Sequence, residues 1–163
     1  MLKGGNADDT YVFGNNDWGN DTIVDTASPD KYPDTGNFAE FGSTDKSLTT
    51  RIIVNLTSSA NSPEVSNGRL TGTVNWPNNA IDGVYVGSVT NDTVNGNART
   101  NTIVAKSEEG DSDTINAGAG NDWISVLDLA GGDSVDCGED VIGIPDDDQV
   151  FADADDTVTN CER

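Results

Sequence analysis

The sequence contains no histidine, and its 8 lysine and arginine residues face 29 aspartate and glutamate residues. The missing histidine excludes Ser-His-Asp and Cys-His catalytic arrangements and a histidine general base. A net charge of −21 without a basic patch excludes nucleic acid as a partner. Close carboxylate pairs arise by chance in so acidic a chain and do not indicate a glycosidase. We therefore expect a protein that is not an enzyme.

Long apolar runs are also missing. No stretch approaches 18 consecutive apolar residues, so no membrane span is expected. The N-terminus has no signal-peptide h-region, which leaves open a fragment of a longer protein or export without an N-terminal signal. With only 34% hydrophobic residues, an acidic disordered chain is one interpretation. Regularly placed Val, Ile and Tyr and 18 glycines favour a folded domain instead. Because such dense charge opposes a compact state, a divalent cation is predicted to neutralise it.

The two cysteines, Cys137 and Cys161, lie 24 positions apart near the C-terminus. No histidine is available to share a zinc site with them. A disulfide is predicted, with two free thiols as the alternative. In the chain-entropy model, closing a loop of this length stabilises the fold by about 3.5 kcal/mol. Such a bond would staple the last part of the chain.

A nine-residue pattern is the main positive signal. Residues 117–125 read Ala-Gly-Ala-Gly-Asn-Asp-Trp-Ile-Ser, close to the calcium-binding nonapeptide G-G-x-G-x-D-x-U-x, in which U is a large apolar residue. Asp92 and Asn101 are nine residues apart, as are Asp113 and Asp122. Chance recurrence in an Asp-rich chain is the alternative. The triplet Asp/Asn-x-apolar recurs at Asp9, Asp21, Asp92, Asn101, Asp113, Asp122 and Asp133, with weaker copies at Asp140, Asp148 and Asp156.

The repeat predicts an all-β fold: a right-handed parallel β-roll or β-helix of stacked nonapeptide-like repeats. Each unit is a six-residue turn, in which glycine permits positive φ, followed by a three-residue strand with its central side chain inward. Two units make one coil. Alternation of Ile52, Val54 and Leu56 predicts a further strand with one buried face. The apolar core is predicted to contain Tyr11, Ile23, Val94, Ile103, Ile115, Ile124, Val135, Val150 and Val158.

Residues 1–163 are predicted to form a single β-roll domain. It comprises N-terminal repeats over 1–25, a degenerate strand and loop section over 26–90, and C-terminal repeats over 91–163 with a cap stapled by the cysteines.

Several segments resemble the RTX family, the haemolysin-type calcium-binding repeat proteins with a parallel β-roll. The resemblance is strongest over residues 4–25 and 91–137, extends over 138–163, and is weak over 26–90. The resemblance implies type I secretion and attachment to a toxin, protease, lipase or adhesin. The pattern departs from the family at Ala7 and Ala117, which replace glycines, at Asn101, which replaces an Asp, and at residues 145–148, which lack glycine. We therefore expect fewer calcium sites than repeats.

Several calcium ions are the predicted cofactor, since turn carbonyls and carboxylates supply the hard oxygen ligands that calcium prefers. Stacking predicts that Asp92 lies near Asp113, Asn101 near Asp122, and Asp122 near Asp140. Asp9 and Asp21 are expected in separate turns. The predicted metal-binding residues are Gly5, Asp9, Gly19, Asp21, Asp92, Asn101, Asp111, Asp113, Gly118, Gly120, Asp122, Asp133, Asp140 and Asp156.

The predicted function is that of an extracellular structural module that folds and is stabilised on binding calcium, secreted by a bacterium or held at its surface. One alternative is a subunit of a calcium-bridged filament or surface layer, a homopolymer joined through the coil ends at Tyr11 and Phe151. Another is a carbohydrate-binding or adhesive module of a larger secreted enzyme, which binds an acidic polysaccharide or cell surface near Trp18, Trp76 or Trp123. Trp123 is expected to point into solvent.

Overall fold

The computed structural model is an all-β protein. It describes residues 1–4, 8–14, 19–24, 37–42, 51–56, 65–66, 72–75, 81–88, 90–106, 111–128, 131–139 and 147–161, and these contain no helix. The strands form two sheets. In spatial order, the six-stranded sheet contains β1 (Thr10–Phe13), β3 (Phe38–Phe41), β7 (Gly83–Val86), β9 (Thr102–Ala105), β11 (Trp123–Ser125) and β13 (Gln149–Phe151). The eight-stranded sheet contains β14 (Thr157–Thr159), β12 (Ser134–Asp136), β10 (Thr114–Gly118), β8 (Thr93–Asn97), β4 (Ile53–Asn55), β5 (Val65–Ser66), β6 (Gly72–Asn75) and β2 (Gly19–Thr22).

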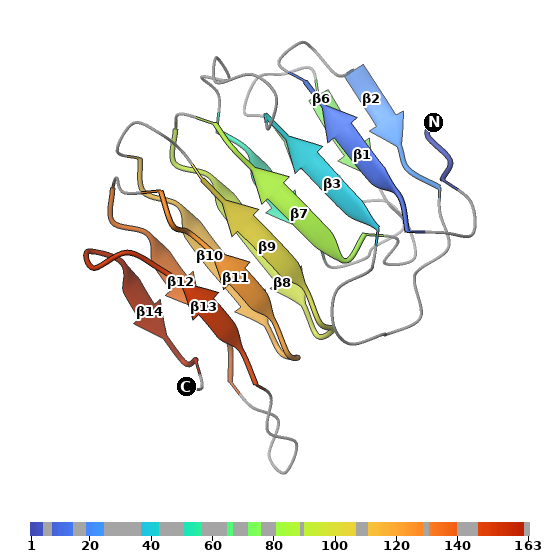
Figure 1. Ribbon diagram of the computed structural model, residues 1–163. Helices are drawn as coiled ribbons and strands as arrows, with labels where there is room; N and C mark the ends of the chain where they lie inside the picture. Colours follow the sequence, from blue (N-terminus) through green and yellow to red (C-terminus); the bar gives the residue numbers. More distant parts are fainter. Residues whose placement is uncertain are drawn as a thin grey trace.

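From β7 to β14, consecutive strands alternate between the two sheets, and each strand pairs in parallel with the next strand of its own sheet. We call one strand of each sheet, with its turns, a coil. Figure 1 shows the six-stranded sheet in front and the eight-stranded sheet behind it. Parallel neighbouring strands need a crossover connection, which is usually a helix. Here the strand of the opposite sheet provides the crossover, so the parallel sheets form without helices. The arrangement is compatible with a parallel β-roll or β-helix.

The N-terminal half departs from simple alternation. β5 pairs antiparallel with both β4 and β6, so one strand of the eight-stranded sheet runs against the others. β1 pairs with β3, and β2 with β6, although long sequence separations lie between these partners. At the outer edge of β2, Leu2 forms an isolated parallel bridge with Ile23. The predicted parallel fold therefore holds for the two sheets as a whole, with β5 as an exception.

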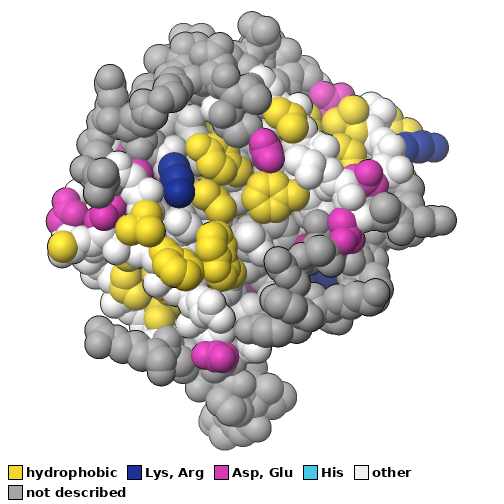
Figure 2. All heavy atoms as spheres, viewed as in Figure 1, with side chains coloured by type: hydrophobic (Ala, Val, Ile, Leu, Met, Phe, Trp, Pro, Cys, Tyr) yellow, Lys and Arg dark blue, Asp and Glu magenta, His cyan; other side chains and the backbone are white. Residues whose placement is uncertain are grey.

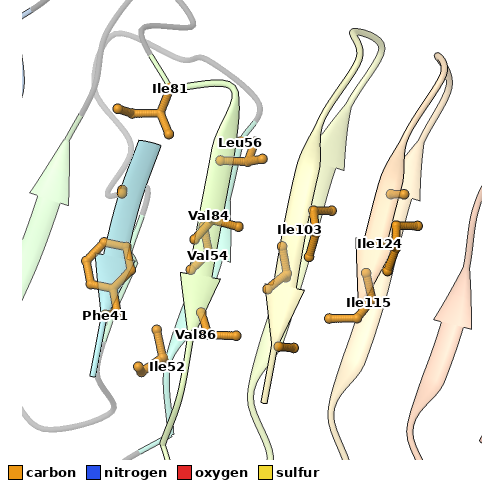
Figure 3. Packing of buried hydrophobic residues seen from close by; sticks show 14 of the residues in the cluster. Phe41, Ile52, Val54, Leu56, Ile81, Val84, Val86, Ile103, Ile115 and Ile124 are labelled. Atoms are coloured by element: carbon orange, nitrogen blue, oxygen red, sulfur yellow. The ribbon is translucent and has the colours of Figure 1, made fainter. Parts of the chain in front are cut away.

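The core is a thin layer between the two sheets, filled by the inward residue of each strand. Figure 3 shows Ile103, Ile115 and Ile124 projecting into this layer from successive strands. Fully burying one such side chain contributes about 1.5–3 kcal/mol. Of the nine predicted core residues, seven are buried, Val150 is partly buried, and Val158 is 42% exposed because no further coil covers it. The predicted strand around Val54 is confirmed, since Ile52, Val54 and Leu56 are all fully buried.

The predicted disulfide is present. Cys137 follows β12 and Cys161 follows β14, and their Cα atoms lie 5.2 Å apart. The bond ties the last strand of the eight-stranded sheet to the preceding coil. A disulfide is typical of proteins that fold in an oxidising compartment. Within the part of the chain that the structure describes, no helix is long and apolar enough to cross a membrane.

Candidate functional site

Acidic residues line up directly before the strands of the eight-stranded sheet. The register aligns Ile53, Thr93, Thr114, Ser134 and Thr157, so the residues one position earlier form a column. Each of its carboxylates accepts a hydrogen bond from a backbone N–H of the preceding coil, at 2.7–2.9 Å. We call Asp92, Asp113, Asp133 and Asp156 the first column.

A second column precedes the strands of the six-stranded sheet. Every one of its six residues is Asp or Asn. Asp122 Oδ1 accepts a hydrogen bond from the N–H of Asn101 at 2.7 Å, and Asp148 Oδ1 accepts one from the N–H of Asp122 at 2.7 Å. At the other end, Asn37 Oδ1 accepts one from the N–H of Asp9 at 2.9 Å. The second column is Asp9, Asn37, Asp82, Asn101, Asp122 and Asp148.

Three carboxyl groups of the first column, those of Asp92, Asp113 and Asp133, are buried and hard to ionise. Burial raises the pKa of Asp113 to about 8, and the carboxylates of Asp92, Asp111 and Asp133 add to the rise. Burial likewise raises the pKa of Asp92 and of Asp133 to about 6. Hydrogen bonds to backbone N–H groups act in the opposite direction but are outweighed. At pH 7 Asp113 is therefore largely protonated while Asp92 and Asp133 are largely ionised, and full ionisation of the column is opposed by burial and by repulsion.

Neighbouring carboxylates of a column are spaced like the strands they precede, roughly 4.8 Å apart. At an effective dielectric constant of about 20, two unit charges at that distance repel by about 3 kcal/mol. Asp111 lies beside this column, with 4% of its surface exposed. Its negative charge contributes to the raised pKa values of Asp92, Asp113 and Asp133. A positive charge in this region would remove a large repulsion.

The glycines of the best nonapeptide lie where successive turns touch. Gly118 and Gly120 have φ of 103° and 114°, in the left-handed region that glycine tolerates best. A side chain on Gly118 would collide with the carbonyl of Asn97, and one on Gly120 with the backbone of Arg99. These two residues belong to the turn one coil earlier. The predicted glycine turns are therefore confirmed here, and they let coils stack at backbone distance.

Two of the predicted neighbour pairs are confirmed, Asp92 with Asp113 and Asn101 with Asp122. The third pair is not tested, because Asp140 lies outside the described residues. Among the described residues, the N–H of Asp122 donates to Asp148. The spacing here is longer than in the preceding coil: Trp123 pairs with Gln149, 26 residues on, whereas Thr102 pairs with Trp123, 21 residues on.

The N-terminal positions are mixed. Asp9 precedes β1, as expected for a turn ligand. Asp21 and Gly19 lie within β2, and Asp21 aligns with Val74, so the prediction that Asp21 sits in a turn is wrong. The carboxylate of Asp21 instead lies 3.7 Å from the N-terminal amine. Gly5 and Asp140 lie outside the described residues, as do Trp18 and Trp76.

Three members of the second column are absent from the predicted ligands: Asp148 appears only as a weaker copy of the triplet, and Asn37 and Asp82 do not appear. Asp82, in the triplet Asp82-Gly83-Val84, satisfies the same pattern as the predicted sites, and its carboxylate forms an ion pair with Arg99. Asn37 escaped notice because Ala39 replaces the large apolar residue of the triplet. The signal for Asp82 was present in the sequence.

The chemistry of both columns suits a hard cation. Their side chains offer oxygen from carboxylates and amides, and calcium takes six to eight oxygens, including backbone carbonyls and water. Within the described residues, Asp133 Oδ2 and Asp9 Oδ2 are buried and accept no hydrogen bond. No three acidic or cysteine side chains converge on one point within that same part of the chain. Any bound calcium would therefore need carbonyl or water ligands besides one or two carboxylates.

No protein-family model matches the sequence, and a search of curated proteins found no match.

Proposed function

We propose that this protein is an extracellular structural module whose fold is stabilised by several calcium ions bound along the two columns. The observation that carries the proposal is the buried part of the first column, Asp92, Asp113 and Asp133, whose successive carboxyl groups stack with raised pKa values. Calcium, when bound, supplies the positive charge that offsets this repulsion. We further propose that the coil is right-handed, as nearly all parallel crossover connections are.

The residues present fit this cation. Asp92, Asp113, Asp133 and Asp156 would hold it from one sheet edge, and Asp122 and Asp148 from the other, with turn carbonyls as further ligands. Asp111 lies beside the first column, where its carboxylate adds oxygen. A net charge of −21 over the whole chain adds a general attraction for cations. Secretion follows from the same proposal, because calcium is abundant outside cells and the disulfide persists there.

The experiment compares two variants, each of which replaces two carboxyl groups by amides. Asp113→Asn with Asp133→Asn neutralises two members of the first column while keeping an oxygen acceptor at each position. Asp155→Asn with Glu139→Gln neutralises two exposed residues. The thermal unfolding midpoint of each is measured in EDTA and in millimolar calcium.

A site filled to 100 times its Kd stabilises the fold by about 2.7 kcal/mol. The wild type and the exposed-residue control should gain stability on adding calcium, and the column variant should gain much less. Equal gains by both variants would contradict the proposed ligands, and no gain by the wild type would contradict the function itself.

A second candidate is a filament, favoured by the sheet edges at β13 and β14. Among the described strands these two are outermost at one end of their sheets, so one edge of each carries backbone groups without a neighbouring described strand. Between them lies a hollow of about 600 Å³, lined in part by Val150, Ala152 and Val158. Phe151 remains a candidate end contact, whereas Tyr11 is buried and does not serve as one. Sedimentation in calcium tests this: a filament predicts growth with protein concentration that Val158→Asp abolishes, and a monomer at every concentration would contradict it.

A further inference from the structure

The outer face of the six-stranded sheet is unusual for so acidic a protein. Each of its strands contributes two residues that point away from the core, and the register aligns them in two rows. Only one of these twelve residues, Glu40, is charged, although the chain contains 29 acidic residues. The first row is Thr10, Phe38, Gly83, Thr102, Trp123 and Gln149, and the second row is Val12, Glu40, Tyr85, Val104, Ser125 and Phe151.

Aromatic residues recur on this face at a fixed interval. Phe38 and Tyr85 lie on neighbouring strands in opposite rows, and Trp123 and Phe151 repeat that arrangement three strands further on. The second pair is in contact, with ring centroids 5.3 Å apart. At a strand spacing of roughly 4.8 Å, the two pairs are about 14 Å apart along the stack of coils.

The rings of the first pair lie down on the sheet. A side chain on Gly83 would collide with the Phe38 ring, and one on Gly87 would meet Tyr85 Cε1 at 2.6 Å. Glycine thus leaves room for each ring to cover backbone and to turn a face outward. In the second pair, Trp123 is 39% exposed and Phe151 is 43% exposed. Figure 2 shows hydrophobic side chains gathered across this side of the molecule, with few charged groups among them.

We propose that this face, which we call the aromatic face, binds a neutral, extended polysaccharide chain that runs along the stack of coils. The apolar faces of pyranose rings would rest on Phe38, Tyr85, Trp123 and Phe151, and sugar hydroxyls would meet Thr102 and Gln149. One sugar of an extended β-linked chain advances by nearly one strand spacing, so successive rings keep step with successive strands.

Charge selects the class of polymer. None of the twelve residues of the aromatic face is lysine or arginine; Lys106 follows β9 beside it, and the net charge of −21 repels an anionic polymer as a whole. A neutral chain avoids that repulsion. The proposal therefore replaces the acidic polysaccharide expected from sequence with a neutral one. It is independent of calcium as a ligand, requiring only that the protein is folded.

The test uses the whole chain in saturating calcium, with cellohexaose and amorphous cellulose as probes. Trp123→Ala with Phe151→Ala removes one aromatic pair, and Trp123→Phe keeps a ring. Thr114→Ala with Thr157→Ala alters exposed residues of the opposite sheet and is the matched control. Far-UV circular dichroism checks that each variant is folded.

We expect the wild type, the control and Trp123→Phe to bind both probes. The double alanine variant should bind with an affinity lower by roughly tenfold or more; tenfold corresponds to 1.4 kcal/mol. Equal binding by the control and double alanine variants would overturn the proposal, as would absence of wild-type binding to both probes. Tighter binding of an anionic polymer such as polygalacturonate would also overturn it. So would self-association of the wild type that the double alanine variant loses, because a second copy of the protein would then bind the aromatic face.

Discussion

At the scale of single residues, the column aspartates perform two separable tasks. As acceptors, they receive a hydrogen bond from a backbone N–H of the preceding coil, and removing one carboxylate leaves that buried N–H unsatisfied. As charges, they repel one another in a buried row. Asparagine preserves the first task and removes the second, so the Asp, Asn and Ala forms of one position distinguish the two. Nature already places Asn at position 101.

Asp113→Asn should stabilise the calcium-free protein, because it removes the carboxylate whose pKa is raised most while keeping an acceptor for the N–H of Asp92. Asp113→Ala should destabilise it by about 1–3 kcal/mol through the lost acceptor. Urea unfolding in EDTA at pH 8 measures both. The account of the column fails if the Asn and Ala variants are equally destabilised.

The calcium-free protein should lose stability as pH rises. The pKa values of Asp92 and Asp133 are raised to about 6 and that of Asp113 to about 8, from an ordinary 3.8. The folded state therefore binds more protons than the unfolded chain between these limits. The stabilisation is complete below about pH 3.8 and is lost as pH passes through 6 and then 8. Urea midpoints in EDTA at pH 4.5, 6 and 8 should fall in that order, and a rising series would contradict this assignment.

At the scale of elements, strands of three to five residues are held chiefly by the side chains that they place between the sheets. Ile115 in β10 stacks in register with Val94 of β8 and Val135 of β12, and all three are fully buried. Short strands have few backbone hydrogen bonds of their own, so this apolar row carries much of the stability.

Ile115→Ala should destabilise the protein by about 2–5 kcal/mol because it opens a cavity in that row. Its neighbour Thr114→Ala, on the exposed side of the same strand, should change stability by about 0.5 kcal/mol or less. Equilibrium denaturation in calcium measures both changes. Similar effects at the two positions would mean that β10 does not present Ile115 inward.

The elements that could be predicted from sequence are those with a local signal. Where the nonapeptide is kept, the Asp-x-apolar triplet located β9, β10 and β11 and their inward residues. Where spacing varies, local pattern fails: Asp21 lies inside a strand, and Asp148, only a weaker copy of the triplet, is the residue that pairs with the N–H of Asp122. β5 could not be predicted, because its antiparallel pairing depends on partners that the sequence does not mark.

At the scale of the whole molecule, a thin core holds together a chain of net charge −21. The sheets supply a compact form, and the columns place much of the acid where repulsion is strongest. Neutralisation by protons or by a cation stabilises the same structure, so pH and calcium should act on it together. The second column directly precedes the first row of the aromatic face, but its Asp122 is buried whereas the neighbouring Trp123 is exposed, so calcium can support the fold without covering the aromatic rings.

The most direct test is a calcium titration of the EDTA-stripped protein at pH 7.5, followed by far-UV circular dichroism, with magnesium in parallel. The account predicts a cooperative gain of β signal that saturates by about millimolar calcium, as in other extracellular calcium modules, with magnesium inert. A chain that is already fully β in EDTA and equally stable with and without calcium would contradict it. The columns would then be hydrogen-bonding ladders alone.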